Sequence, residues 1–463
     1  MRNSVIAVCA LVAVGGLMLT GEAQAQPRTL QDALAAAYSN NPTLQAARAQ
    51  LRATDETVPQ ALAGWRPTVV LSSTAGYGDG SYLSGLGPKV RNNRDIFTGQ
   101  AVATQPLYRG GATQAGTRQA DNRVFAQRAR LLATEQQLFS DTVNSYVNVI
   151  QQQQVLQLNI NNEQVLARQL QATQDRFRVG EITRTDVAQA EAALAGARAT
   201  RETSQGNLQT ARGNYRRYVG ELPDQLVEPQ PIKQPVHSQQ EAVQLASNNN
   251  PNVIAALFDD AAARDNVDLQ FSALMPQVSL QAQAARSDNA SILRQRIIGG
   301  QVVVNASVPL YQGGAEYSRV RQARQQEQQT RKLVDDIRRQ AVQQATQGWE
   351  QLVAARSTID STKSQIRANQ IALEGVQREA IVGSRTTLDV LNAEQALLNS
   401  RVTLVTNLSN LIMASYSLTA SIGRLSARDL NLNVPLYDET AYYAAVRDKL
   451  FGTSDYARDQ PGR

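Results

Sequence analysis

Two stretches in the second half of the chain alternate mostly polar and apolar residues with a period of two. The polar positions run from Gln277 to Gln283 and again from Gln301 to Ser307, with Val, Leu and Ala between them. This alternation is typical of a strand that has one apolar face and one polar face. It predicts a strand pair within about 276–310.

A less regular version of the same pattern lies in the first half. It predicts a strand pair within about 67–107, with strands near 67–77 and 96–107. The segments that link the paired strands, Gly78 to Arg94 and Arg286 to Arg296, are rich in Gly, Asn, Ser and Arg and are predicted to be exposed loops. The chain therefore offers four amphipathic strands.

The longest patterned segments are predicted to be helical. The chain has no proline between Pro106 and Pro223 or between Pro309 and Pro435, and both spans are rich in Ala, Gln, Arg and Leu. Such residues favour helix, and no breaker interrupts them. A helix from Thr117 to Val179 would extend about 95 Å. The expected helical hairpins comprise helices at 112–179 and 187–218 in the first half, and at 315–381 and 390–424 in the second.

Apolar residues in the first long helix often occur as adjacent pairs, such as Leu131 with Leu132 and Leu138 with Phe139. Neighbouring residues on a helix point about 100° apart, so these pairs supply two apolar seams. Two seams favour a wall in which each helix has neighbours on both sides. The alternative is a two-stranded coiled coil, which needs only one seam.

The chain contains a long internal repeat. The sequence Pro-Leu-Tyr-Arg-Gly-Gly-Ala at Pro106 returns, with one change, at Pro309, and Asn-Asn-Pro at Asn40 returns at Asn249. A unit of roughly two hundred residues exceeds the common solenoid repeats and indicates two homologous halves. The predicted organisation is a signal peptide at 1–25, a first repeat at 26–218, a proline-rich linker at 219–237, a second repeat at 238–433, and a tail at 434–463 that is disordered or loosely wrapped near the middle.

The first residues have the pattern of a secretory signal peptide. Arg2 precedes a largely apolar run, and the small residues Ala23-Gln24-Ala25 form a cleavage pattern at its end. The alternative, a transmembrane helix, is disfavoured because the run is shorter than the ~20 residues that a spanning helix needs.

The composition leaves few residues for chemistry. The one cysteine, Cys9, lies in the predicted signal peptide, and the one histidine, His237, lies in a proline-rich stretch. Disulfides, thiolate metal sites and histidine-based acid–base sites therefore lack the residues they need. The net charge of +6 is spread along the chain without a dense basic block beside aromatics, which does not favour nucleic-acid binding. We expect no enzyme activity, no metal and no cofactor.

Four amphipathic strands raise a packing problem. A tilted strand of about nine to eleven residues can cross an outer membrane, but an open sheet edge does not survive in lipid. Four strands cannot close a barrel by themselves, since known barrels begin at about eight strands. We therefore expect the chain to combine its strands with those of other copies in a symmetric oligomer.

Taken in their order along the chain, the signal peptide, the two strand pairs and the two helical hairpins resemble the TolC family of outer-membrane efflux and secretion channels. The resemblance covers about Thr29 to Asn433, and its most specific parts are the segments from Arg178 to Val187 and from Val382 to Leu391. It implies a mainly α chain with a β-barrel part, in which a trimer forms a twelve-stranded outer-membrane barrel continued by a long periplasmic helical barrel. The two homologous halves of each chain would contribute four strands.

The resemblance also implies a function and a set of partners. The chain would be the passive exit duct of a tripartite efflux pump or a type I secretion system. Its partners would be two further copies of itself, a periplasmic adaptor, an inner-membrane ABC-type or proton-driven transporter, and outer-membrane lipid. The competing hypothesis is a periplasmic coiled-coil adaptor or scaffold without a pore, which would lack the two strand pairs.

Adaptor docking is implied for the two hairpin tips, at 180–186 and 382–389. The matching residues are Val179 and Gly180 in the first tip, and Val382, Gly383 and Ser384 in the second. Glycine would let an adaptor backbone approach closely, but glycine also permits a tight turn by itself. Both explanations of these glycines remain open.

The resemblance finally implies a periplasmic gate. Asp389 matches an acidic ring at the mouth, and Asn392 stands where the family has a second acidic ring, so weaker cation binding is expected. Arg385 and Asp186 match a pair that links neighbouring hairpins, while Ala380 replaces a tyrosine that assists this lock. Both aspartates also follow a threonine at the spacing of a helix cap, which is the alternative role for Asp389.

Overall fold

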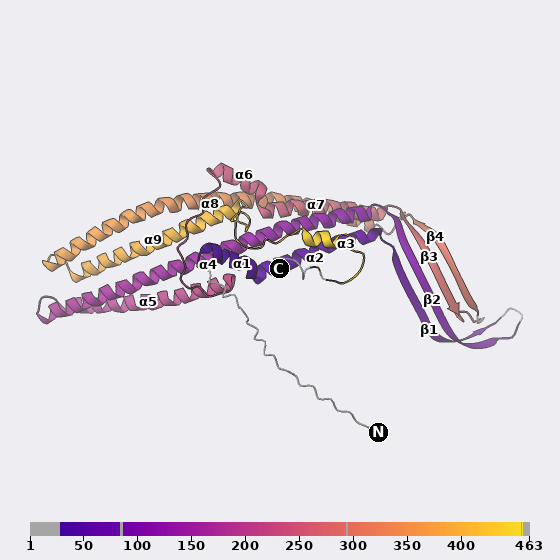
Figure 1. The fold of residues 1–463 in the computed structure, drawn as a ribbon, viewed down its shortest axis with the longest axis horizontal. Helices are drawn as coiled ribbons and strands as arrows, with labels where there is room; N and C mark the ends of the chain where they lie inside the picture. The colour runs from indigo at the N-terminus through magenta and orange to yellow at the C-terminus, as the bar shows by residue number, and fades with distance from the viewer. Residues whose placement is uncertain (1–27, 84–86, 293–294, 455, 457–463) are drawn as a thin grey trace, which may run out of the picture.

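The computed structural model describes residues 28–83, 87–292, 295–454 and 456. The predicted signal peptide at 1–25 lies outside these residues. The chain is long and narrow, with the strands at one end and the tips of two helical hairpins at the other (Figure 1). Short helices and the C-terminal segment lie beside the middle.

The two halves of the chain contain corresponding elements in the same order. The first half comprises α1 (Leu30–Asn40), α2 (Pro42–Asp55), α3 (Thr57–Leu62), η1 (Ala63–Trp65), β1 (Thr68–Tyr82), β2 (Val90–Arg109), α4 (Ala112–Arg178) and α5 (Arg184–Val219). The second comprises α6 (Gln239–Asn249), α7 (Pro251–Phe271), η2 (Ser272–Leu274), β3 (Gln277–Asp288), β4 (Arg296–Ser307), α8 (Ala315–Ile381) and α9 (Thr387–Ser421), followed by α10 (Ala441–Val446). This order confirms the two homologous halves.

The four strands form one antiparallel sheet in the order β1-β2-β3-β4. The predicted loop from Gly78 to Arg94 is wrong at both ends, because β1 and β2 stay paired as far as Tyr82 and Val90. An ion pair of 2.6 Å between Arg91 and Asp79 joins the two strands in this extension. The ends of the second predicted loop, Arg286 to Arg296, likewise belong to β3 and β4.

Along the part of the sheet nearer the helices, one face is apolar and the other is mostly polar. On the apolar face Leu71 and Val302 are 81% and 69% exposed. On the polar face the Asn305 side chain donates a hydrogen bond of 3.0 Å to Gln281. Within the described chain, β1 and β4 each pair with a strand on one side only, so the sheet has two open edges.

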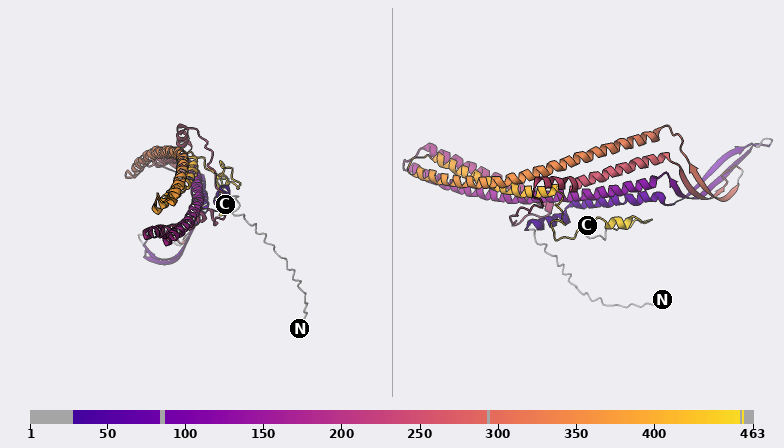
Figure 2. Two further views of the ribbon diagram at one scale, coloured as in Figure 1. Left: turned by 90° about the vertical axis from the view of Figure 1, so that its left-hand side faces the viewer. Right: turned by 90° about the horizontal axis from the view of Figure 1, so that it is seen from above.

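The helix α4 lies in the middle of a helical wall. It packs against α5, α7 and α9, and α8 packs beside α7 and α9. The side chains of Leu131, Leu138 and Phe139 are all buried, and the helices curve into an arc when the chain is viewed end-on (Figure 2). These neighbours on both sides of α4 confirm the predicted wall rather than a two-stranded coiled coil.

A buried asparagine joins the start of one helix to the end of another in each half. The Asn41 side-chain oxygen caps α2 by accepting the N–H of Thr43 at 2.9 Å, and its amide donates to the Tyr218 carbonyl in the last turn of α5 at 3.0 Å. Asn250 makes the equivalent two bonds between α7 and α9. The same residue thus satisfies a free N–H at one helix start and a free carbonyl at another helix end. This double role explains the repeated Asn-Asn-Pro sequence.

The described part of the tail lies beside the middle of the chain, as predicted, but the prediction that it is disordered or loosely wrapped is wrong. The hydroxyl of Tyr442 lies 2.9 Å from Glu56, and that of Tyr443 donates to Asp121 at 2.7 Å. The fully buried guanidinium of Arg48 lies over the Tyr437 ring, with its Cζ 5.2 Å from the ring centroid. These contacts fasten the tail to α2 and α4, and residues 455 and 457–463 lie outside the described part.

Candidate functional site

The two hairpin tips share one backbone geometry. Gly180 and Gly383 have φ values of +81° and +80°, which lie in the left-handed region. The N–H of Gly180 donates to the Phe177 carbonyl at 3.0 Å, and the next N–H donates to Arg176 at 3.0 Å, which closes the end of α4. This is the geometry in which glycine ends a helix at least cost. The turn explanation of both glycines is therefore confirmed.

The surface around the tip glycines is open. No heavy atom lies within 4 Å of a Cβ built on Gly180 or Gly383. Beside them Val179 is 71% exposed and Val382 is 78% exposed. Ser384 instead donates its hydroxyl to the Glu379 carbonyl at 2.9 Å and so supports its own turn.

Both returning helices begin with a complete capping box. Thr386 accepts the N–H of Asp389, and the Asp389 carboxylate accepts the Thr386 N–H at 3.0 Å. These hydrogen bonds from the Thr386 N–H and hydroxyl, with a smaller contribution from Arg385, lower the pKa of Asp389 below its usual range. Thr183 and Asp186 form the same box at α5. The capping role predicted for Asp389 is confirmed.

Arg385 binds a partner that the sequence analysis did not identify. Its Nε donates to Glu379 of the same hairpin at 2.9 Å, and this bond raises the pKa of Arg385. At the other tip the signs are exchanged, since Arg176 on the helix pairs with Glu181 on the loop at 3.0 Å. The two equivalent helix positions carry opposite charges, Arg176 and Glu379, and this difference was the sequence signal that could have revealed both ion pairs.

The structure does not bring Arg385 and Asp186 together within one chain. The Asp186 carboxylate accepts the N–H and hydroxyl of Thr183 instead, at 3.0 and 2.7 Å. Asn392 lies one turn after Asp389 and is exposed, whereas Ala380 is half-buried. Any contact between Arg385 and Asp186 would therefore have to join two copies of the chain.

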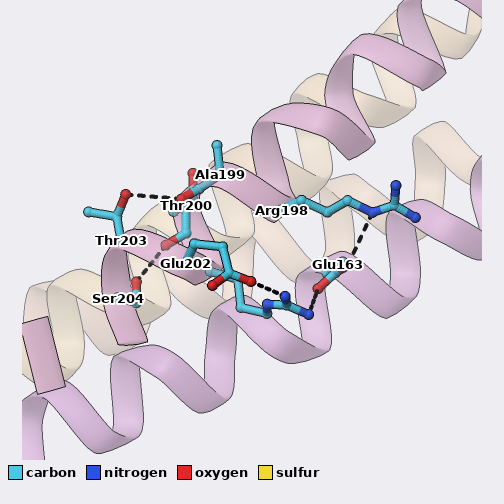
Figure 3. A network of polar contacts seen from close by, with 8 residues as sticks. Glu163, Arg198, Ala199, Thr200, Glu202, Thr203 and Ser204 are labelled. Carbon is cyan, nitrogen blue, oxygen red and sulfur yellow. Dashed lines mark hydrogen bonds and ion pairs between the residues drawn. The ribbon is translucent and has the colours of Figure 1, made fainter. Parts of the chain in front are cut away.

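Polar contacts hold the arms of the first hairpin together. The side chain of Glu163 on α4 accepts Arg198 at 3.3 Å and Arg201 at 3.0 Å, both from α5 (Figure 3). Nearby, the buried Asn159 amide donates to the Ser204 hydroxyl at 2.7 Å. Exposed ion pairs stabilise a protein only slightly, but together these bonds fix how the two arms lie. The second hairpin has side-chain hydrogen bonds of the same kind.

In the residues that the structure describes, no three His, Cys, Asp or Glu side chains are grouped to hold a metal ion. None of the described helices combines the length and apolar character that a membrane-spanning helix requires.

Comparison with known proteins identifies the class. The family model of the outer membrane efflux proteins matches residues 33–221 and 242–424, one match in each half. Outer membrane efflux protein BepC of Brucella suis is 35% identical over 461 residues, which cover 98% of each chain. Outer membrane protein TolC of Escherichia coli is 25% identical, over 90% of this chain and 86% of that protein.

Solved structures share the fold. The outer membrane protein VceC from Vibrio cholerae superimposes with a TM-score of 0.74 at 22% identity, over 85% of this chain and 96% of that chain. The chain described here belongs to the outer membrane efflux protein family. It is an outer-membrane channel protein of efflux or secretion, and the alternative of a periplasmic adaptor or scaffold without a pore is not supported.

Proposed function

We propose that three copies of this chain form the passive exit duct of a tripartite efflux pump or type I secretion system. The observation that carries the proposal is the sheet, whose apolar face is exposed and whose edge strands β1 and β4 each lack a partner on one side. Pairing β1 of one copy with β4 of the next would remove both edges and give a closed barrel of twelve strands. The arc of helices would then continue as a helical barrel.

The two hairpin tips are the proposed docking surface for a periplasmic adaptor. Val179, Gly180, Val382 and Gly383 are exposed there, and the open space around the glycines would admit an adaptor backbone. An inner-membrane transporter, ABC-type or proton-driven, would supply the energy. The apolar face of the barrel would contact outer-membrane lipid. The proposed repeats are 26–218 and 238–433, with the linker at 219–237 between them.

The proposed gate lies just inside the tips. Three copies of Asp389 would form an acidic ring at the periplasmic mouth, because trimer symmetry brings equivalent residues toward one axis. Because Asn392 is uncharged, the mouth would have no second acidic ring one turn further along α9. The pair of Arg385 with Asp186 of a neighbouring copy would compete with the Glu379 pair already present in each chain. The entrance lock is therefore expected to be weak, and weaker still with Ala380 beside it.

Planar-bilayer conductance with added divalent or trivalent cations tests this function and its gate. In the Asp389→Asn variant, we expect the cation concentration for half-block to rise by about tenfold, because the ring loses three negative charges. Asn392→Asp should strengthen the block by adding a ring, and Arg385→Ala should loosen the entrance modestly.

Asp32→Asn provides the matched control, because Asp32 completes the same capping box in α1, away from the tips. It should leave the block unchanged. Wild-type protein without conductance would contradict the duct. Normal block in Asp389→Asn, together with a lower melting temperature, would show that Asp389 only caps α9.

A further inference from the structure

We propose that Arg94 sets the charge preference of the outer mouth of the duct, and this inference rests on the proposed trimeric barrel. The strand register places Arg94 on a defined face. Gln100 and Thr104 of β2 pair with Ala285 and Gln281 of β3, on the polar face of the sheet. Arg94 lies an even number of residues from both along an unbroken pairing with β1, so it points to the same face. That face would line the pore.

Arg94 is the one charged residue on a long part of this face. From the bulge near Pro106 to the far end of the sheet, the other described strand residues on the polar face are uncharged. Arg109 follows the bulge but lies at the opposite end of the sheet, where a Cβ on Gly64 would be 2.9 Å from its Nη1. The remaining charged residues of the strands lie on the other face, namely Asp79, Arg91, Asp95, Arg286, Asp288 and Arg296.

The arginines on the outer face form direct ion pairs with carboxylates. Among the described residues Arg94 makes no such pair, although its charge lies near enough to interact with Asp79. Arg91 binds Asp79 at 2.6 Å, and Asp288 binds one arginine from β3 and one from β4 at 2.8 and 2.7 Å. The Nε and Nη1 atoms of Arg94 are buried and have no hydrogen-bond partner among the described residues. The positive charge of this guanidinium is therefore not neutralised by a direct ion pair, and its field can attract anions in the pore.

The neighbouring strand leaves space for this guanidinium. A Cβ on Gly78 would lie 3.4 Å from the Arg94 Cζ, and a Cβ on Gly80 would lie 3.6 Å from its Nη1. Arg94 therefore lies over two glycines of β1. Ile292, from the connection between β3 and β4, also reaches Gly80, and its carbonyl accepts the Asn92 amide at 2.8 Å. The absence of side chains at Gly78 and Gly80 thus gives the Arg94 guanidinium room to lie close to β1.

Three copies of Arg94 would surround the pore at the end opposite the Asp389 ring. Fixed like charges that line a channel raise the local concentration of ions of opposite sign. The outer mouth is therefore expected to favour anions, both small inorganic ions and the anionic groups of exported molecules.

Reversal potentials across planar bilayers in a KCl gradient test this inference. We expect Arg94→Gln to lower the chloride-to-potassium permeability ratio by about twofold or more. Arg94→Lys should keep the ratio close to that of the wild type. Arg296→Gln, on the outer face of β4, should leave the ratio unchanged, because Arg286 still binds Asp288. The effect should shrink between 0.1 M and 1 M salt, because the Debye length falls from about 10 Å to about 3 Å.

An unchanged ratio in Arg94→Gln, or an equal change in Arg296→Gln, would overturn the inference and leave the duct intact. If Arg94→Gln lowers the melting temperature without changing the ratio, Arg94 only holds the hairpin and the inference is also overturned. Wild-type protein that forms no pore would contradict the proposed function itself.

Discussion

Replacing Gly180 or Gly383 by leucine is expected to abolish export while the trimer still assembles. A Cβ on either glycine meets no other atom within 4 Å, so the fold itself has space for the side chain. The left-handed backbone costs a non-glycine residue about 1–2 kcal/mol, which a stable oligomer tolerates. The leucine would instead occupy the space that we propose an adaptor backbone enters.

The measurement is drug or protein export in cells that lack their own duct, together with the oligomeric mass of the purified variant. Gly220 provides the matched control, since it ends α5 with φ of +99° and also has no atom within 4 Å of a Cβ. Gly220→Leu introduces the same backbone strain away from the tips and should retain export. Loss of the trimer in the tip variants, or equal loss of export in Gly220→Leu, would favour the turn as the only role of the glycines.

Replacing Val302 by arginine is expected to prevent insertion into the outer membrane. Val302 is 69% exposed on the apolar face of β4. An arginine that faces lipid near the middle of the bilayer costs about 2–4 kcal/mol, and a trimer would carry three of them. Gln301→Arg changes the adjacent residue of the same strand, which points to the polar face, and should be tolerated.

The measurement is the fraction of protein that inserts into lipid vesicles, followed by the resistance of the strands to protease. Equal insertion of the two variants would contradict the assignment of faces. If Val302→Arg inserts and Gln301→Arg does not, the assignment of the two faces would be reversed, with the polar face toward lipid.

Much of the fold follows from residue patterns that are local. Alternation along β3 and β4 predicts the sheet, and proline-free spans with paired apolar residues predict the helical wall. The predicted loop from Gly78 to Arg94 failed because glycine was taken as a loop residue, whereas Gly78 and Gly80 make room for Arg94 inside a strand pair. The prediction of a disordered or loosely wrapped tail failed because Tyr437, Tyr442 and Tyr443 bind partners that are distant in the sequence.

The candidate site was predictable to the extent that it depends on a single turn. The capping boxes and the tip glycines have fixed spacings, and the structure contains both. The pairing of Arg385 with Glu379 was missed because its signal, the opposite charges of Arg176 and Glu379 at equivalent helix positions, appears only when the two halves are compared. The proposed contact with Asp186 depends on a second copy, whose position no pattern within one chain specifies.

Cross-linking of the edge strands tests the central claim most directly. The only cysteine, Cys9, lies in the predicted signal peptide, so introduced cysteines would be the only reactive thiols of the mature protein. Cysteine at Val70 on β1 would be combined in turn with cysteine at Gln301, Val303 or Asn305 on β4, and treated with a short thiol cross-linker in the membrane. At the pair that lies in register, we expect a denaturing gel to contain one, two and three linked chains and nothing larger. Single chains at every pair, or a ladder that continues beyond three, would contradict a closed trimeric barrel.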